Sequence, residues 1–225
     1  MAKEAPDIEN LTRILQTTLP HARLEVRALD LCPAVRLHLI SPDNMDRAFS
    51  PDEVRSILGT TPYWAFCWAA GHALAAFLLT RRRISQGKRV LDVGAGSGVA
   101  AVAAAMAGAK EVVACDTDER ALEAVRANAR LNGVRIATCR SLEEVNGTVD
   151  LLLASDLFYD LENRPLLAAF PDMAREVLIA DARVSIAQSG PYLKFFEMQA
   201  ETLPDLKEPG GFNRVGFYLA GTAPP

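Results

Sequence analysis

One glycine-rich segment, Asp92-Val93-Gly94-Ala95-Gly96-Ser97-Gly98, narrows the possible folds of this chain of 225 residues more than any other feature. It follows an apolar run at 89–93 that predicts a buried strand, and it precedes an Ala- and Val-rich run at 98–107 that predicts a helix. Glycines at such a turn let the backbone bend tightly and approach a ligand that a Cβ atom would push away. Asp116 ends the next predicted strand, 111–115, where a carboxylate can accept hydrogen bonds from both hydroxyls of a ribose. This order of strand, loop, helix and acid predicts a nucleoside-binding βαβ unit.

The residues around the loop favour one nucleoside cofactor over another. The dinucleotide pattern G-x-G-x-x-G/A needs Gly or Ala at position 99, where this chain has Val99. Asp92 stands two positions before the first glycine, and its carboxylate would repel a pyrophosphate but suits a cation. S-adenosylmethionine carries an ammonium and a sulfonium and no phosphate, so the residues favour it over NAD(P). The alternative is that Asp92 caps the loop and contacts no ligand.

Short apolar runs alternate with helical patterns from residue 88 onward, which predicts βαβ units and a parallel sheet. Further strands are expected at 134–139, 149–154, 177–180 and 214–220, and helices at about 119–131 and 192–200. Before residue 88 the patterns predict a helix at 8–19, strands at 24–28 and 35–40, and a helix running from Pro62 to about residue 79. We expect a single domain over 1–225, in which 1–87 is an extension packed on the core at 88–225.

Composition excludes several classes of protein. Half of the residues are hydrophobic and the formal net charge is −4, which fits a globular chain and disfavours nucleic-acid binding. No apolar run is long enough to span a bilayer, and the polar start is unlike a secretory signal, so no membrane partner is expected. The four cysteines show no C-x-x-C spacing, which indicates reduced thiols, no metal site and a cytoplasmic protein.

Three segments resemble the class I, seven-β-strand S-adenosylmethionine-dependent methyltransferases. Residues 90–98 are similar to the first motif of that class, and Asp116 to its ribose-binding acid. The segment 62–75, PYWAFCWAAGHALA, and the segment 154–160, ASDLFYD, resemble the lysine methyltransferases of electron transfer flavoprotein β subunit. The resemblance implies an α/β fold: a Rossmann-like, seven-stranded, mostly parallel sheet with helices on both faces, plus an N-terminal helix and strand extension.

The resemblance also implies roles for individual residues. S-adenosylmethionine would contact six residues: Asp92, Gly94, Gly96, Asp116, Trp68 and Ser155. Asp156 would position the substrate lysine and Tyr159 would assist it as a catalytic residue, while Trp64 and Phe158 would contact the substrate. The alternatives are that Phe158 and Tyr159 are core aromatics and Asp156 caps the next helix. The two tryptophans, four apart and expected on one side of a helix, could instead fasten the N-terminal part to the core.

The function expected from these residues is methyl transfer to a lysine of a protein, with electron transfer flavoprotein β subunit or a similar protein as substrate. Two alternatives remain: another acceptor such as a ribosomal protein or a small amine, and a non-catalytic scaffold. Methyltransferases of nucleic-acid bases often carry Asn/Asp-Pro-Pro-Tyr/Phe after strand four, where this chain has Ser155-Asp156-Leu157-Phe158. After Asp181 the sequence Ala182-Arg183-Val184 departs from the expected D-P-G-R turn, in a region that often shapes the substrate entrance.

Overall fold

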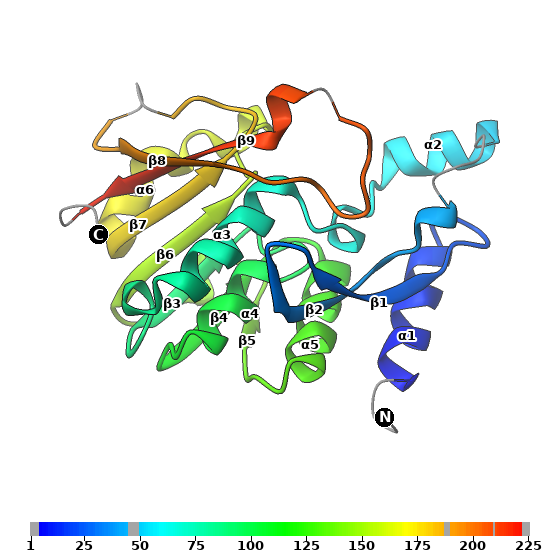
Figure 1. The fold of residues 1–225 in the computed structure, drawn as a ribbon, viewed down its shortest axis with the longest axis horizontal. Coiled ribbons are helices and arrows are strands. Elements are labelled where there is room, and N and C mark those ends of the chain that lie inside the picture. The colour runs from blue at the N-terminus through cyan, green and yellow to red at the C-terminus, as the bar shows by residue number, and fades with distance from the viewer. Residues whose placement is uncertain (1–4, 45–49, 187–189, 209, 222–225) are drawn as a thin grey trace.

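The centre of the fold is a seven-stranded sheet with strand order β5-β4-β3-β6-β7-β9-β8 (Figure 1). The computed structural model describes residues 5–44, 50–186, 190–208 and 210–221. Neighbouring strands are parallel from β5 to β7, whereas β9 runs antiparallel to both β7 and β8. The strands are β3 (Arg89–Val93), β4 (Glu111–Cys115), β5 (Ala137–Cys139), β6 (Val149–Ser155), β7 (Ala174–Asp181), β8 (Leu193–Gln199) and β9 (Arg214–Ala220). The expected mostly parallel sheet is therefore confirmed.

Helices cover both faces of this sheet because successive strand residues point to opposite sides. Val90 of β3 joins a core cluster with α3 (Ala69–Thr80) and α4 (Val99–Met106), while its neighbour Leu91 joins a second cluster with α6 (Leu166–Met173). The first helical layer also receives Val125 from α5 (Glu119–Leu131). Small alanines dominate α3 and α4, which lets the two helices pack closely on each other and on the sheet. No described helix has the length and apolarity that crossing a membrane requires.

The N-terminal residues pack mainly on α5. They form α1 (Ala5–Gln16), an antiparallel hairpin of β1 (Leu24–Leu29) and β2 (Cys32–Ile40), and α2 (Pro51–Gly59). Leu11 and Leu15 of α1 bury their side chains with Trp64 against the alanines of α5. Ser50 caps the N-terminus of α2, and its side chain and that of Glu53 form a capping box.

Asn128, near the C-terminal end of α5, links the β1–β2 hairpin to the glycine loop by hydrogen bonds. Its side chain is fully buried, its Oδ1 accepts the backbone N–H of His38 at 2.8 Å, and its Nδ2 donates to the carbonyl of Ser97 at 2.8 Å. One amide thus binds two buried main-chain groups that lie far apart in the sequence.

The prediction of a helix running from Pro62 is wrong for the first residues of that range. Tyr63–Ala65 form one turn of 3-10 helix, and α3 begins only at Ala69. Between them Cys67 is extended and pairs with Leu203 through two backbone hydrogen bonds, of 2.9 and 2.8 Å. Trp64 and Trp68 therefore do not share a helical face.

The helix expected at 192–200 is also wrong, because residues Leu193–Gln199 form β8. A β-bulge between Lys194 and Phe196 shifts the register of this strand against β9. The bulge breaks the strict alternation of a strand, so the apolar residues fall at spacings that look helical.

Replacing Asn128 by Ala should lower the free energy of unfolding by roughly 2–4 kcal/mol, since two buried main-chain groups lose their hydrogen-bond partner. Chemical denaturation of Asn128→Ala beside Asn10→Ala, a change at an exposed position of α1, measures the effect. Equal stabilities of the two variants would contradict the bridging role of Asn128.

Candidate active site

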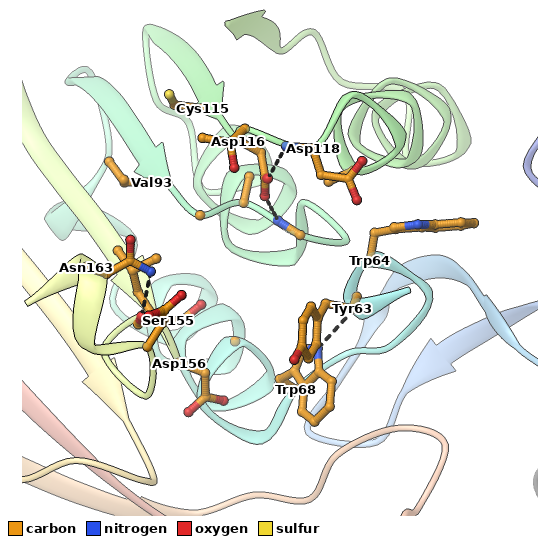
Figure 2. Close-up of a pocket in the computed structure, with 18 of the residues that line it drawn as sticks. Tyr63, Trp64, Trp68, Val93, Cys115, Asp116, Asp118, Ser155, Asp156 and Asn163 are labelled. Carbon is orange, nitrogen blue, oxygen red and sulfur yellow. Dashed lines mark hydrogen bonds between the residues drawn. The ribbon is translucent and has the colours of Figure 1, made fainter. Parts of the chain in front are cut away.

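A cavity of about 1080 Å³ opens at the carboxyl ends of β3, β4 and β6 (Figure 2). The loop 94–97, the end of β4 with Asp116, and residues 155–157 after β6 form its inner walls. Tyr63, Trp64 and Trp68 of the aromatic segment 63–68 also line it, as does Arg183. In open α/β sheets this carboxyl edge is the usual place for a ligand.

The glycine loop has the conformation that its sequence predicts. Gly94 and Gly96 have φ values of +70° and +52°, which side chains rarely adopt. A Cβ atom on Gly94 would lie 2.7 Å from Cδ1 of Leu157, whereas one on Gly96 would meet nothing within 4 Å. Gly94 is therefore favoured mainly by its left-handed backbone, since the end of the Leu157 side chain could shift, while Gly96 lies beside open space at the cavity wall.

Asp116 holds the loop from the opposite side. Its Oδ2 accepts the N–H of Gly96 at 2.9 Å and its Oδ1 accepts the N–H of Asp118 at 2.9 Å. Each carboxylate oxygen can accept a second hydrogen bond, so the half-buried group can also receive the hydroxyls of a ribose. Burial raises the pKa of Asp116, although the two backbone hydrogen bonds oppose this.

Asp92 lies beneath the loop and not among the residues that line the cavity. It is 1% exposed, and its Oδ2 accepts the N–H of Ala101 in the first turns of α4 at 3.1 Å. Burial raises its pKa to about 7, and the charge of Asp116 contributes to the rise. Its bond to α4 and its absence from the cavity lining agree with the alternative in which Asp92 contacts no ligand, and its expected contact with the cofactor stays a prediction.

Asp156 is the first residue after β6 and faces the cavity (Figure 2). Its backbone is left-handed, with φ +46°, and its carboxylate joins two other elements. Oδ2 accepts the N–H of Ala70 in the first turn of α3 at 3.0 Å, and Oδ1 accepts the N–H of Ala182 after β7 at 3.3 Å. Burial and the nearby charge of Asp181 raise its pKa to about 6. Asp156 therefore does not cap the helix that follows it in the chain, since its carboxylate binds α3.

Three aromatic rings line the cavity near Asp156. The Nε1 of Trp68 donates to the carbonyl of Tyr63 at 2.9 Å, and the centroids of their rings lie 5.8 Å apart. The ring of Tyr63 also lies 5.8 Å from that of Tyr159, which is 47% exposed. Tyr159 is thus no core aromatic.

Phe158 and Trp64, which were expected to contact the substrate, are both almost fully buried. Phe158 is fully buried and packs 6.1 Å from Phe170 on the α6 side of the sheet, so the expected substrate contact is wrong and the core alternative holds. Trp64 touches the cavity, but it is 1% exposed, its ring points away from Asp156 (Figure 2), and it packs with α1 and α5. This packing agrees with the alternative in which Trp64 fastens the N-terminal residues to the core, and its expected contact with the substrate stays a prediction.

Ser155 faces the cavity at the end of β6, as expected for a residue that contacts the cofactor. Its Oγ would lie 3.4 Å from a Cβ placed on Gly71, so β6 and α3 approach closely at this point. The expectation for Ser155 stays a prediction, as do those for the loop glycines and Trp68.

Arg183 and Glu208 were not foreseen. The guanidinium of Arg183 lies over the rings of Trp68 and Phe212, at 5.3 and 4.7 Å, and forms an ion pair with Glu208. Glu208 also accepts a hydrogen bond from Thr202 at 2.6 Å. Both residues lie in the part of the chain where the sequence departs from the family pattern, so no motif could indicate them.

The donor set of the cavity fits S-adenosylmethionine. Asp116 can bind a ribose, and the acids Asp116 and Asp156 give the cavity a negative field that suits a sulfonium and an ammonium. The basic residues in its lining are Arg140 and Arg183, and neither belongs to the glycine loop, where a pyrophosphate would bind. Within the ranges that the structure describes, no cluster of His, Cys, Asp and Glu could hold a metal ion.

Comparison with known proteins supports the same chemistry. The family model "Ribosomal protein L11 methyltransferase (PrmA)" matches residues 73–162. A solved ribosomal protein L11 methylase from Lactobacillus delbrueckii subsp. bulgaricus has the same fold, with a TM-score of 0.52 and 24% identity over 67% of this chain and 77% of that one.

Two relatives match over most of both chains. The electron transfer flavoprotein beta subunit lysine methyltransferase of Xenopus laevis is 35% identical over 179 residues, which are 76% of this chain and 72% of the relative. The homolog of that enzyme in Caenorhabditis elegans is 32% identical over 220 residues, 84% of this chain and 88% of the relative. The protein is an S-adenosylmethionine-dependent methyltransferase and belongs to the electron transfer flavoprotein β-subunit lysine methyltransferase family.

Proposed function

We propose that this protein methylates a lysine side chain of electron transfer flavoprotein β subunit or of a closely similar protein. The names of the two long-matching relatives support this substrate. The observation that carries the proposal is the position of Asp156, a buried carboxylate held by two backbone amides and facing the cavity beside three aromatic rings.

When bound, S-adenosylmethionine supplies an electrophilic methyl group, so the protein has to supply alignment and a neutral amine. An unperturbed lysine has a pKa of about 10.4 and is almost fully protonated at neutral pH. The carboxylate of Asp156 can accept a hydrogen bond from the amine and thereby direct its lone pair. Because the amides of Ala70 and Ala182 fix both of its oxygens, the carboxylate stays in one orientation.

The aromatic side chains complete the lysine site. Trp68 and Tyr63 form a wall beside Asp156, and Tyr159 extends this wall to the mouth of the cavity. Aromatic faces attract a cationic nitrogen and exclude water from the apolar stem of a lysine. Burial and the neighbouring Tyr63 keep the pKa of Tyr159 above its usual value, so its hydroxyl remains a neutral hydrogen-bond donor.

The direct test is methyl transfer from radiolabelled S-adenosylmethionine to purified electron transfer flavoprotein β subunit, followed by mass spectrometry of the labelled peptides. Ribosomal protein L11 serves as the second acceptor, because a family model with that name matches the central part of the chain. We expect label on lysine of the flavoprotein subunit. Label on L11 alone, or on RNA in a fractionated lysate, would contradict the proposed substrate.

Asp156→Asn should reduce turnover by about 100-fold or more, the usual contribution of a positioned acid–base group, because a neutral amide oxygen accepts the hydrogen bond of the amine far more weakly. The melting-temperature shift on adding S-adenosylmethionine should stay near that of the wild type. Asp172→Asn, at an exposed position of α6, is the matched control. Undiminished turnover of the Asp156 variant would show that another group positions the lysine.

Activity should fall on the acid side as the pH drops through about 6, since Asp156 has a raised pKa of about 6 and acts in its ionised form. The pH dependence of kcat/KM measures this step, and the deprotonation of lysine adds a further rise at higher pH. Burial raises the pKa of Asp92 to about 7, so Asp92 could produce a similar step. The pH dependence of the residual activity of Asp156→Asn is therefore the control. If this variant retains the step near 6, the step belongs to another group.

Asp116→Ala should abolish the stabilisation that S-adenosylmethionine gives, because the variant loses both the ribose acceptor and the bond to Gly96. For the wild type at one hundred times the dissociation constant, the cofactor should add about 2.7 kcal/mol to the free energy of unfolding. Thermal melting with and without cofactor measures both proteins, with Asp172→Ala as control. An unchanged shift in Asp116→Ala would remove Asp116 from the cofactor site.

A further inference from the structure

Large apolar side chains are exposed on the cavity lining, at Tyr63 and Tyr159, and beside it, at Leu161 between the lining residues Asp160 and Glu162. Tyr159 is 47% exposed, Leu161 is 68% exposed, and Tyr63, whose ring lies against Tyr159, is 44% exposed. Most other large apolar residues of the described chain are buried. Exposed apolar residues that gather beside a reactive cavity are typical of an interaction site.

This segment is fixed by hydrogen bonds at both of its ends. Oδ1 of Asp160 accepts the N–H of Glu162 at 2.9 Å and caps the 3-10 turn Leu161–Asn163. The Nδ2 of Asn163 donates to the carbonyl of Leu157 at 3.1 Å (Figure 2). Leu161 is therefore held outward by its backbone, and a partner can bind it without first ordering the loop.

Two carboxylates flank the exposed leucine. Asp160 and Glu162 line the cavity and are exposed, and within the described part of the chain neither forms an ion pair. A partner that places a positive side chain beside them would gain an attractive contact and a faster, salt-dependent association.

We propose that Tyr63, Tyr159, Asp160, Leu161 and Glu162, here called the substrate rim, dock the protein substrate through a segment with an apolar and a positively charged residue beside the target lysine. The inference rests on the proposed function. Its basis is that the rim adjoins the cavity that contains Asp156. When a lysine of the substrate reaches Asp156, the residues next to that lysine come against the rim, which offers them apolar area and negative charge.

Leu161→Ala tests the apolar part of the substrate rim. For electron transfer flavoprotein β subunit, KM should rise about threefold to tenfold while kcat stays near the wild-type value, as for the loss of one interface contact. The melting shift with S-adenosylmethionine should not change. The control is Leu193→Ala on β8, which removes a leucine of similar exposure, 65%, far from the carboxyl edge of the sheet.

The double variant Asp160→Asn with Glu162→Gln tests the charges and keeps an oxygen to cap the 3-10 turn. At low salt its KM should exceed that of the wild type, and the rise of KM with added salt should be smaller than in the wild type. The matched control is Glu9→Gln with Asp172→Asn, which removes two exposed acids elsewhere. A purely structural effect would alter the melting temperature and would leave the salt dependence unchanged.

The outcomes separate this inference from the proposed function. If the wild type methylates the flavoprotein subunit and both rim variants retain its KM and its salt dependence, the docking surface is wrong and the function stands. If the wild type leaves that subunit unlabelled, the proposed substrate is wrong, and the same variants are compared on the protein band that the wild type labels in a lysate. Equal labelling of that band by rim and control variants, or label on a small amine alone, would overturn the docking surface.

Discussion

Buried and half-buried carboxylates at the carboxyl ends of four adjacent strands bind backbone N–H groups, and the active site depends on these bonds. At the ends of parallel strands, the backbone N–H groups of the following turns need hydrogen-bond partners outside the sheet. Here Asp92 binds α4, Asp116 binds the glycine loop, Asp156 binds α3, and Asp181 binds the turn at residues 183 and 184. Each bond fixes one wall of the cavity, so the same residues that complete the fold also shape the site.

These carboxylates share one electrostatic consequence. Burial raises the pKa of all four, and neighbouring acids contribute at Asp92, Asp116 and Asp156. A set of buried acids with raised pKa values is unfavourable in isolation and becomes favourable next to a cation. The cofactor of this family carries a sulfonium and an ammonium, so its charge opposes the repulsion among the acids. A pyrophosphate would add to that repulsion.

The cofactor side of the fold could be predicted from the sequence because its signals are local. The glycine loop, Asp116 and the flanking strands lie within thirty residues. The strands are recognisable as short apolar runs and the loop by its glycines. Two elements were mistaken where a tertiary contact overrides the local pattern. The bulge in β8 hides its alternation, and pairing with Leu203 keeps Cys67 extended directly before the alanine-rich helix α3.

No comparable local sequence pattern indicates the residues around the proposed lysine site. Trp68, Arg183 and Phe212 come from three distant segments and meet only in the folded chain, where Glu208 neutralises the arginine. Residues of this kind can be replaced while the cofactor loop stays the same, because no special backbone geometry requires them. Family membership therefore determines the methyl donor more firmly than the acceptor. In the proposed function the choice of acceptor depends on side chains beside the cavity, where the exposed Leu161 and its flanking acids offer apolar area and negative charge to the neighbours of the target lysine.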